Sequence, residues 1–187
     1  MLEVGSGGGE LARLLAAAGY EIVAVDPVAP EGRIFRRTTI EDFDEPGPFD
    51  AVLAARSLHH VRELEPVLDK LAALAPLLVL DEFAWDRLDA ATADWYERQR
   101  RALAAAGHEG APALRDWEAE HEGLHGYETL RRELDARYGE VAFEWRPYLY
   151  RYLGGVSTEA LEETLVETGA IQGLGFRYAG TVRKTSG

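Results

Sequence analysis

The chain has 187 residues, of which 47% are hydrophobic and 28% charged, a composition typical of a globular protein. Its net charge of −13 argues against a nucleic-acid partner, because phosphate binding needs clustered basic residues. The absence of cysteine excludes disulfides, thiolate metal ligands and a cysteine nucleophile. No apolar run reaches the length of a membrane span and no export signal is recognisable, so we expect a cytoplasmic protein without a membrane partner.

The first 81 residues alternate short apolar runs with amphipathic segments. One helix is expected at about 10–18, with Leu11, Leu14, Leu15 and Ala18 on its apolar face, and another at 62–75. Because buried parallel strands read as continuous apolar runs, the pattern predicts a parallel sheet covered by helices on both faces. The expected strands are LEVG (2–5), EIVAVD (21–26), RIFRRTTI (33–40), DAVLAA (50–55) and LLVLD (77–81).

The pattern changes after Asp81. Helical periodicity covers 88–106 and 127–138, with a polar, glycine-punctuated stretch between them. An aromatic-rich strand is expected at 141–153, a helix capped by Ser157 follows it, and a last strand covers 175–184. We therefore expect a single domain over 1–187 with a helical insertion at about 82–138.

The opening segment MLEVGSGGGE places several glycines between the first strand and the first helix. Such a turn lets the backbone approach a ligand closely, and the following helix N-terminus adds free N–H groups. Aligning Gly5 and Gly7 with the dinucleotide fingerprint puts Glu10 at the third glycine position, where its carboxylate would repel a pyrophosphate. The spacing acidic-x-Gly-x-Gly-x-Gly is instead satisfied from Glu3 to Gly9.

With this spacing the sequence resembles the class I S-adenosylmethionine-dependent methyltransferases. The resemblance continues in AVDP, which ends the second strand at Asp26, in PFDAVLAARSLHHV around the fourth strand, and in LAPLLVLDE around the fifth. It implies an α/β, Rossmann-like, doubly wound and mostly parallel seven-stranded sheet, with an antiparallel last strand and a helical insertion after strand 5. It also implies S-adenosyl-L-methionine as cofactor and methyl transfer to a small-molecule acceptor by in-line displacement.

The resemblance further implies where the cofactor binds. Glu3 would lie near its amino-acid end, Asp26 would accept hydrogen bonds from the ribose hydroxyls, and the backbone around Ala55 and Arg56 would face the methionine part. In the family an aspartate often follows the third strand and binds adenine, whereas the corresponding stretch here is TTIED and offers residues 39–41. The complete predicted cofactor set is Glu3, Gly5, Ser6, Gly7, Gly9, Asp26, Pro27, Thr39, Ile40, Glu41, Ala55 and Arg56.

A general base is needed only if the acceptor must lose a proton, and His60, His125 and Glu82 are the candidates. The tandem His59–His60 has an alternative interpretation that we favour, in which the pair packs against the following helix and bonds to backbone. His125 also lies in a stretch with another histidine and three glutamates, but this stretch lacks a clear ligand face, so we expect no metal.

Three questions stay open at this point. Trp85, Trp95 and Trp117 either form a core for the insertion or line an apolar substrate pocket. The second candidate function is a non-catalytic S-adenosylmethionine-binding scaffold of the same fold, and an NAD-dependent oxidoreductase is the least favoured. Members of this family usually carry helices before the first strand, so we expect either an upstream start or closure of the site by the 82–138 segment as a lid, alone or together with a second subunit of a homodimer.

Overall fold

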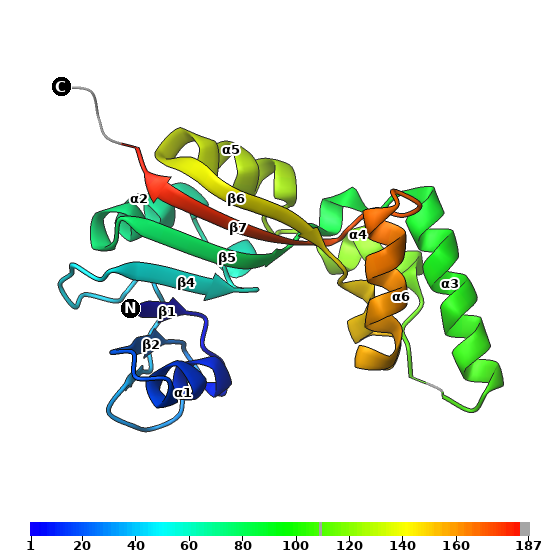
Figure 1. Cartoon of the computed structure of the whole chain (residues 1–187), viewed down its shortest axis with the longest axis horizontal. Coiled ribbons are helices and arrows are strands. Elements are labelled where there is room, and N and C mark those ends of the chain that lie inside the picture. The colour runs from blue at the N-terminus through cyan, green and yellow to red at the C-terminus, as the bar shows by residue number, and fades with distance from the viewer. Residues whose placement is uncertain (109, 184–187) are drawn as a thin grey trace. The chain divides into compact units, whose positions relative to one another are not determined.

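The computed structural model describes residues 1–108 and 110–183, which form two compact units (Figure 1). The first unit contains Met1–Glu82, Glu128–Phe143 and the described chain from Arg177; the second contains Phe83–Tyr127 and Glu144–Phe176. The strands are β1 Leu2–Val4, β2 Val23–Val25, β3 Phe35–Arg36, β4 Ala51–Ala55, β5 Leu77–Phe83, β6 Tyr138–Arg146 and β7 Gly175–Val182. The helices are α1 Glu10–Ala17, α2 Leu64–Leu74, α3 Ala90–Ala105, α4 Trp117–Glu120, α5 Tyr127–Arg137 and α6 Val156–Glu167.

The seven strands form one sheet in the order β3-β2-β1-β4-β5-β7-β6. β1 pairs in parallel with both β2 and β4, β2 with β3, and β4 with β5, while β7 runs antiparallel to β5 (Figure 1). This sheet confirms the predicted fold class. The chain first extends the sheet from β1 to β3 and then returns to the other side of β1, so the strand order reverses between β1 and β4, the position at which open α/β sheets bind ligands.

Two predicted strands are shorter than the sequence pattern indicates, because side chains capture the backbone. Only Phe35–Arg36 pairs within the expected 33–40, and the Thr39 hydroxyl then accepts the Asp42 amide at 3.2 Å to close a turn. The strand expected at 141–153 ends at Arg146. Beyond it the buried Glu162 carboxylate accepts three successive amides and bends the chain into a turn.

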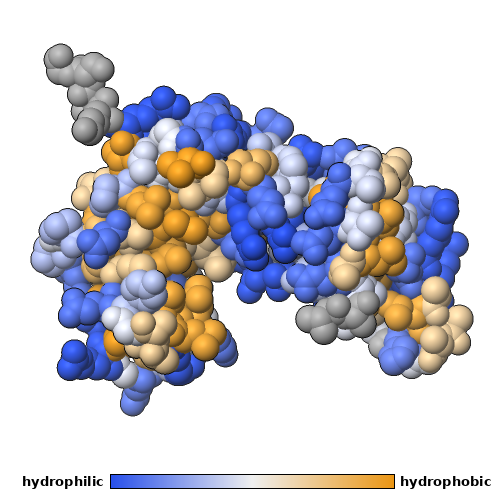
Figure 2. Space-filling view, viewed as in Figure 1, coloured by the Kyte–Doolittle hydropathy of each residue, from blue (hydrophilic) through white to orange (hydrophobic). Residues whose placement is uncertain are grey.

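Helix α1 differs from its predicted packing. Ala12 is fully buried against Ile22 and Ala24, whereas Leu14, expected on the apolar face, is 69% exposed. Helix α1 has only eight residues, and its fully buried contacts are those of Ala12 with Ile22 and Ala24. It therefore covers little of the sheet, and part of its apolar surface meets solvent. Figure 2 shows hydrophobic residues gathered on the visible face of the first unit, over α1 and the neighbouring strands.

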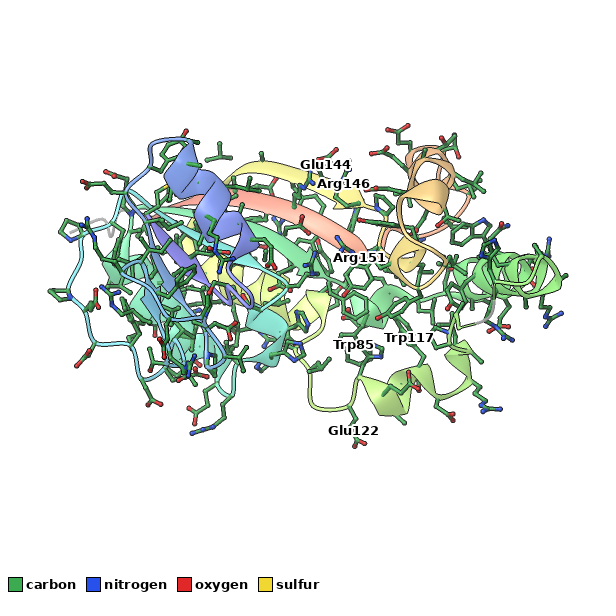
Figure 3. All side chains as sticks on the ribbon, turned by 90° about the horizontal axis from the view of Figure 1, so that it is seen from below. Trp85, Trp117, Glu122, Glu144, Arg146 and Arg151 are labelled. Carbon is green, nitrogen blue, oxygen red and sulfur yellow. The ribbon has the colours of Figure 1, made fainter. Side chains whose placement is uncertain are left out.

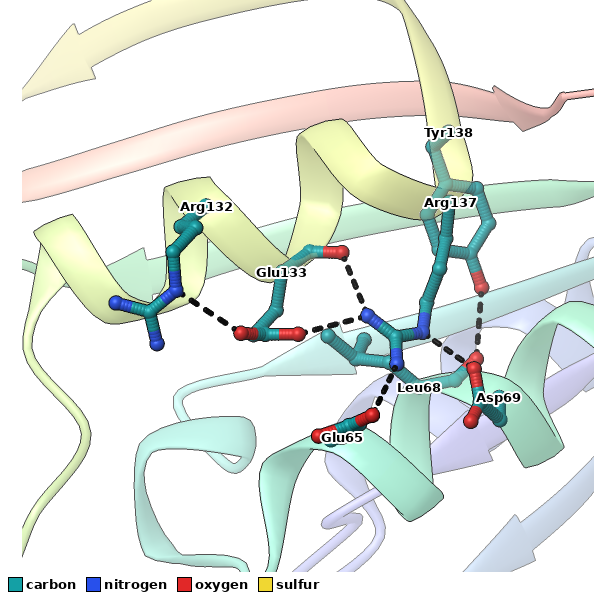
Figure 4. Close-up of polar contacts among 7 residues, drawn as sticks. All are labelled: Glu65, Leu68, Asp69, Arg132, Glu133, Arg137 and Tyr138. Atoms are coloured by element: carbon teal, nitrogen blue, oxygen red, sulfur yellow. Dashed lines mark hydrogen bonds and ion pairs between the residues drawn. The ribbon is translucent and has the colours of Figure 1, made fainter.

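Helix α5 belongs to the first unit, where Arg137 links it to α2 (Figure 4). The Arg137 guanidinium donates to Asp69 at 2.5 Å and to Glu133 at 2.8 Å, and it lies 3.8 Å from Glu65. These hydrogen bonds, with that to Asp69 first, raise the pKa of Arg137, although burial opposes them. Because Arg137 is itself largely buried, this cluster fixes the end of α5 more firmly than an exposed ion pair would.

The second unit has an aromatic core of its own. Trp117 is 6% exposed and packs with Phe83 and Tyr96, which confirms the core interpretation for this tryptophan. Its indole Nε1 donates to the Trp85 carbonyl at 2.9 Å, and the His121 ring contacts the indoles of both tryptophans, which are labelled in Figure 3. His121 is buried among these rings and its Nδ1 lies 2.7 Å from the Trp117 carbonyl, so it serves this core.

Within residues 1–108 and 110–183, no helix combines the length and apolar character that crossing a membrane requires.

Candidate functional site

A cavity of about 390 Å³ opens in the first unit, at the carboxyl ends of the central parallel strands. Four segments of the chain meet there, namely the end of β1, the end of β2, the turn after β3 and the loop after β4. Its lining is Val4, Gly5, Val25, Asp26, Pro27, Thr38, Thr39, Ile40, Glu41, Arg56, Ser57, His60, Val61 and Arg62. The cavity therefore lies at the switch point where ligands of open α/β sheets bind.

The glycine loop needs its glycines for different reasons. Gly5, Gly7 and Gly9 all have positive φ angles of 50° to 81°, a backbone region that favours glycine. A side chain at Gly5 would come within 2.2 Å of the Ser57 Cβ, and one at Gly9 within 2.5 Å of the Phe35 ring. No atom of the described residues lies within 4 Å of the corresponding position at Gly7. The loop is thus packed by protein at both ends and open to a ligand at its middle.

Asp26 joins the glycine loop to the end of β2. Its Oδ2 accepts the Gly7 amide at 2.8 Å and its Oδ1 accepts the Val28 amide at 2.8 Å. A carboxylate has about four lone-pair positions, so each oxygen keeps capacity for another donor. Because Asp26 also lines the cavity, it can accept a pair of hydrogen bonds from a ligand there.

Two polar side chains beneath the glycine loop are buried without hydrogen-bond partners among the described residues. They are the Oε2 of Glu3, whose side chain is 3% exposed, and the hydroxyl of Ser6. Burial, together with the carboxylates of Asp26 and Glu10, raises the pKa of Glu3. An unsatisfied buried carboxylate is costly, so this arrangement favours a ligand that brings a donor or a positive charge.

The turn after β3 is fixed by a lysine from α2. Lys70 Nζ donates to the carbonyl of Ile40 at 2.9 Å and to that of Glu41 at 2.7 Å. The Glu41 side chain accepts the Arg62 amide at 3.1 Å. Burial acts to raise the pKa of Glu41, but this hydrogen bond, others near it and the Arg62 charge lower it overall. The predicted adenine-contact segment is therefore held against the cavity by α2 and its preceding loop.

The loop after β4 is held from below by Glu82. This carboxylate is 0% exposed and accepts the amides of Ser57 at 2.8 Å and Leu58 at 2.7 Å. Its other oxygen lies 2.6 Å from Nδ1 of the buried His59. The Ser57 hydroxyl donates to the Val4 carbonyl at 2.9 Å, which ties the loop to β1. These contacts favour a positioning role for Glu82, since its atoms are enclosed by protein.

The two histidines of the tandem have different surroundings. His59 is buried and held by Glu82, as the structural interpretation expects, whereas His60 is exposed and lines the cavity. Partial burial of the His60 ring is the first cause that lowers its pKa, and the neighbouring His59 is the second, whereas Glu82 acts in the opposite direction. His60 is therefore neutral near pH 7 and can accept a proton.

The structure brings most of the predicted residues to one place. Those that line the cavity are Gly5, Asp26, Pro27, Thr39, Ile40, Glu41, Arg56 and His60. Those near it in the fold but outside its lining are Glu3, Ser6, Gly7, Gly9, Ala55 and Glu82. His125 lies in the second unit, so its catalytic role stays a prediction. Sequence reasoning missed Ser57 and Arg62, whose only signal was their position in the loop after β4.

Comparisons with known proteins agree with this fold. A family model described as a methyltransferase domain matches residues 1–132. Among curated proteins, no match was found. Solved structures with the same fold include a protein from Listeria monocytogenes described as an S-adenosylmethionine-dependent methyltransferase, with a TM-score of 0.60 and 15% identity over 98% of this chain and 89% of that one.

Two further solved structures have comparable TM-scores and sequence identities. A methyltransferase of this kind from Mesorhizobium loti has a TM-score of 0.58 and 15% identity, with 97% of this chain and 90% of that chain covered. The N-methyltransferase NodS from Bradyrhizobium japonicum WM9, solved with S-adenosyl-L-homocysteine, has a TM-score of 0.54 and 15% identity, with 98% and 77% covered.

Proposed function

The chain belongs to the class I S-adenosylmethionine-dependent methyltransferases, and we propose that it methylates a small-molecule acceptor at the cavity of the first unit. The observation that carries this proposal is the cavity itself. Its volume of about 390 Å³ lies in the range of small-ligand sites. It is lined by Asp26, which is predicted to bind the ribose, by the predicted adenine-contact residues 39–41 and by the neutral His60.

The residues present suit the cofactor. S-adenosylmethionine carries a sulfonium and an amino group but no phosphate, so a site containing Glu3, Glu10 and Asp26 attracts it and repels a dinucleotide. The unpartnered Oε2 of Glu3 would receive its amino group, and the free lone pairs of Asp26 its ribose hydroxyls. The open space at Gly7 leaves room for the backbone to approach the ligand.

The protein's part in the reaction is mainly alignment. When bound, S-adenosylmethionine supplies a methyl group on a positively charged sulfur. Asp26 and Glu3 would fix its two ends, and the loop held by Glu82 would hold the acceptor in line with that methyl group. If the nucleophile carries a proton, Nδ1 or Nε2 of His60 would accept it, because the lowered pKa keeps this imidazole neutral.

Two observations support a small acceptor over a macromolecule. A net charge of −13 disfavours nucleic acid, because counterion release needs clustered basic residues. Among proteins of similar fold, a plantazolicin methyltransferase was solved with a desmethylPZN analogue and S-adenosyl-L-homocysteine, and NodS is an N-methyltransferase. The acceptor atom, whether oxygen, nitrogen or carbon, is left open by these observations.

The proposal is tested by following the methyl label. Purified protein is incubated with methyl-tritiated S-adenosylmethionine and separate metabolite, protein and nucleic-acid fractions from a cell extract. We expect the label in the metabolite fraction, and much less of it with the variant Asp26→Asn at a cofactor concentration that only just saturates the wild type. Label in the protein or nucleic-acid fraction would contradict the proposal, and binding of the cofactor without transfer to any fraction would favour the scaffold alternative.

We also propose that the part of the predicted 82–138 segment that belongs to the second unit, Phe83–Tyr127, acts as a lid over the bound cofactor, since water exclusion strengthens the electrostatics of a site. Hydrogen exchange with and without S-adenosyl-L-homocysteine tests this. Slower exchange in α3 and α4 is the expected result. Protection confined to the cavity segments of the first unit, such as residues 39–41, would contradict the lid.

A further inference from the structure

Arg56 has an unusual backbone at the mouth of the cavity. Its φ of 52° makes it the one non-glycine residue with positive φ among residues 1–108 and 110–183. This conformation costs roughly 1–2 kcal/mol for a residue with a side chain. It is maintained because the Arg56 amide donates to the Asp81 carbonyl at 2.7 Å, and Glu82 holds the next two amides. Such strain at a cavity commonly serves a function.

Arg56 is exposed and lines the cavity, and none of the described residues accepts a hydrogen bond from its guanidinium or forms an ion pair with it. This is unexpected in a chain with 33 acidic and 20 basic residues. Arg62, the other arginine of the lining, differs because its charge acts on Glu41 and lowers the pKa of that carboxyl. The side chain of Arg56 thus presents an uncompensated positive charge to whatever occupies the cavity.

Charge is distributed unequally around the cavity. Glu3, Glu10 and Asp26 make the glycine-loop end negative, which suits a cationic cofactor. Arg56 lies in the loop that follows β4 and lines the cavity together with His60. We infer that Arg56 binds an oxyanion, a carboxylate or a phosphate, of the methyl acceptor and thereby selects anionic acceptors. This inference rests on the proposed function, because it assigns the acceptor class of the same site.

The inference is tested with matched acceptor pairs added to protein saturated with S-adenosyl-L-homocysteine. The pairs are p-hydroxybenzoate with p-hydroxybenzamide, glycine with glycinamide, and phosphoethanolamine with ethanolamine, and binding is followed by ligand-observed NMR. We expect the wild type to prefer acidic members, with the carboxylate and phosphate pairs showing which oxyanion is favoured. Arg56→Gln should weaken binding of the preferred acid about 10- to 100-fold and leave binding of its partner without the oxyanion unchanged.

Two variants separate recognition from structure. Arg56→Lys keeps the charge and should retain part of the preference. Arg56→Gly removes the strain, so it should abolish the preference while leaving Tm unchanged or higher. Arg33→Gln is the matched control, because Arg33 is another exposed arginine of the first unit that lies outside the cavity lining.

Three results would overturn the inference. The first is a wild-type protein that binds S-adenosyl-L-homocysteine but shows no preference for acidic members. The second is an Arg56→Gln variant that keeps the preference. The third is an Arg56→Gln variant that loses affinity for S-adenosyl-L-homocysteine but not for methylthioadenosine, which would mean that Arg56 binds the cofactor carboxylate. Failure of the wild type to bind S-adenosyl-L-homocysteine would instead contradict the proposed cofactor site.

Discussion

Both units contain buried glutamates, Glu3 and Glu82 in the first and Glu162 in the second, and the surroundings of Glu162 and Glu3 are opposite. In the second unit Glu162 is 0% exposed and accepts the amides of Tyr148, Leu149 and Tyr150 at 2.6–2.9 Å. In the first unit Glu3 is 3% exposed, and its Oε2 has no hydrogen-bond partner among the described residues. One carboxylate is satisfied by its own protein, and the other is not.

The difference separates structural from functional burial. Burial raises the pKa of both glutamates, but at Glu162 three N–H groups oppose it, whereas at Glu3 the neighbouring Asp26 and Glu10 add to it. A protein retains an unsatisfied buried charge only where something else compensates it. We interpret Glu162 as a structural residue of its turn, and Glu3 as one that a cationic ligand completes.

The largest expected effect is on stability, from Glu162→Ala. This change removes the carboxylate acceptor of one buried and two partly buried amides, so we expect a loss of about 3 kcal/mol and a Tm lower by about 6–12 °C. The affinity for S-adenosyl-L-homocysteine, measured below the transition by calorimetry, should stay close to wild type. Glu163→Ala is the control, because it removes only a partly exposed ion pair with Arg146 and should cost less than about 1 kcal/mol. Equal losses in the two variants would refute the structural role of Glu162.

The corresponding change in the first unit is Asp26→Asn, which should act on binding. Loss of the charged hydrogen bonds to the ribose hydroxyls should weaken S-adenosyl-L-homocysteine about 100-fold. Thermal unfolding without ligand checks that the glycine loop is intact, because Asp26 also accepts the Gly7 amide. Asp44→Asn alters an exposed acid outside the cavity and should leave the affinity unchanged. An unaffected affinity in Asp26→Asn would remove this residue from the site.

A smaller effect of opposite sign is expected from Glu3→Gln. The folded-state pKa of Glu3 is raised above its unfolded value of about 4.5. The free energy of unfolding therefore falls as pH rises from about 4.5 through the folded pKa, because Glu3 ionises more readily in the unfolded chain. We expect the variant to raise Tm by about 2–4 °C at neutral pH, with the gain fading below pH 4.5, and to bind S-adenosyl-L-homocysteine more weakly. A variant less stable than wild type at neutral pH would contradict the interpretation of Glu3.

The smallest effect concerns His60 alone. Its lowered pKa predicts an NMR titration midpoint below 6.5, with the signal identified by its loss in His60→Gln. Because a proton acceptor must be neutral, the acid limb of the wild-type pH–rate profile should also lie below pH 6.5. A midpoint above 6.5 would contradict the lowered pKa, and one above about 7 would mean that His60 is mostly protonated at neutral pH, which does not suit a base.

Short-range patterns in the sequence correctly predicted the features of the fold that depend on residues close together in the chain. The apolar strand runs, the glycine spacing and Asp26 at the end of β2 all lie within short windows, and the observed sheet agrees with them. Contacts between distant segments left no such pattern. Glu82 holds residues 57–59 across more than twenty positions, and Ser57 fills the space that makes Gly5 necessary.

Contacts between distant segments also explain where the predictions from sequence were wrong. The strand expected to reach 153 was cut short by Glu162, which lies on a helix further along the chain. The tandem histidines looked equivalent in sequence, yet only His60 lines the cavity, because the partner that captures His59 comes from β5. Leu14 was assigned to a buried face that the short α1 does not have.

A crystal structure of the protein with S-adenosyl-L-homocysteine tests the central claim most directly. We predict that the ribose hydroxyls contact the Asp26 carboxylate, that the amino group lies against Oε2 of Glu3, and that adenine lies beside residues 39–41. A ligand bound elsewhere, or one that leaves Glu3 and Asp26 untouched, would contradict the account of why the first unit keeps an unsatisfied buried carboxylate.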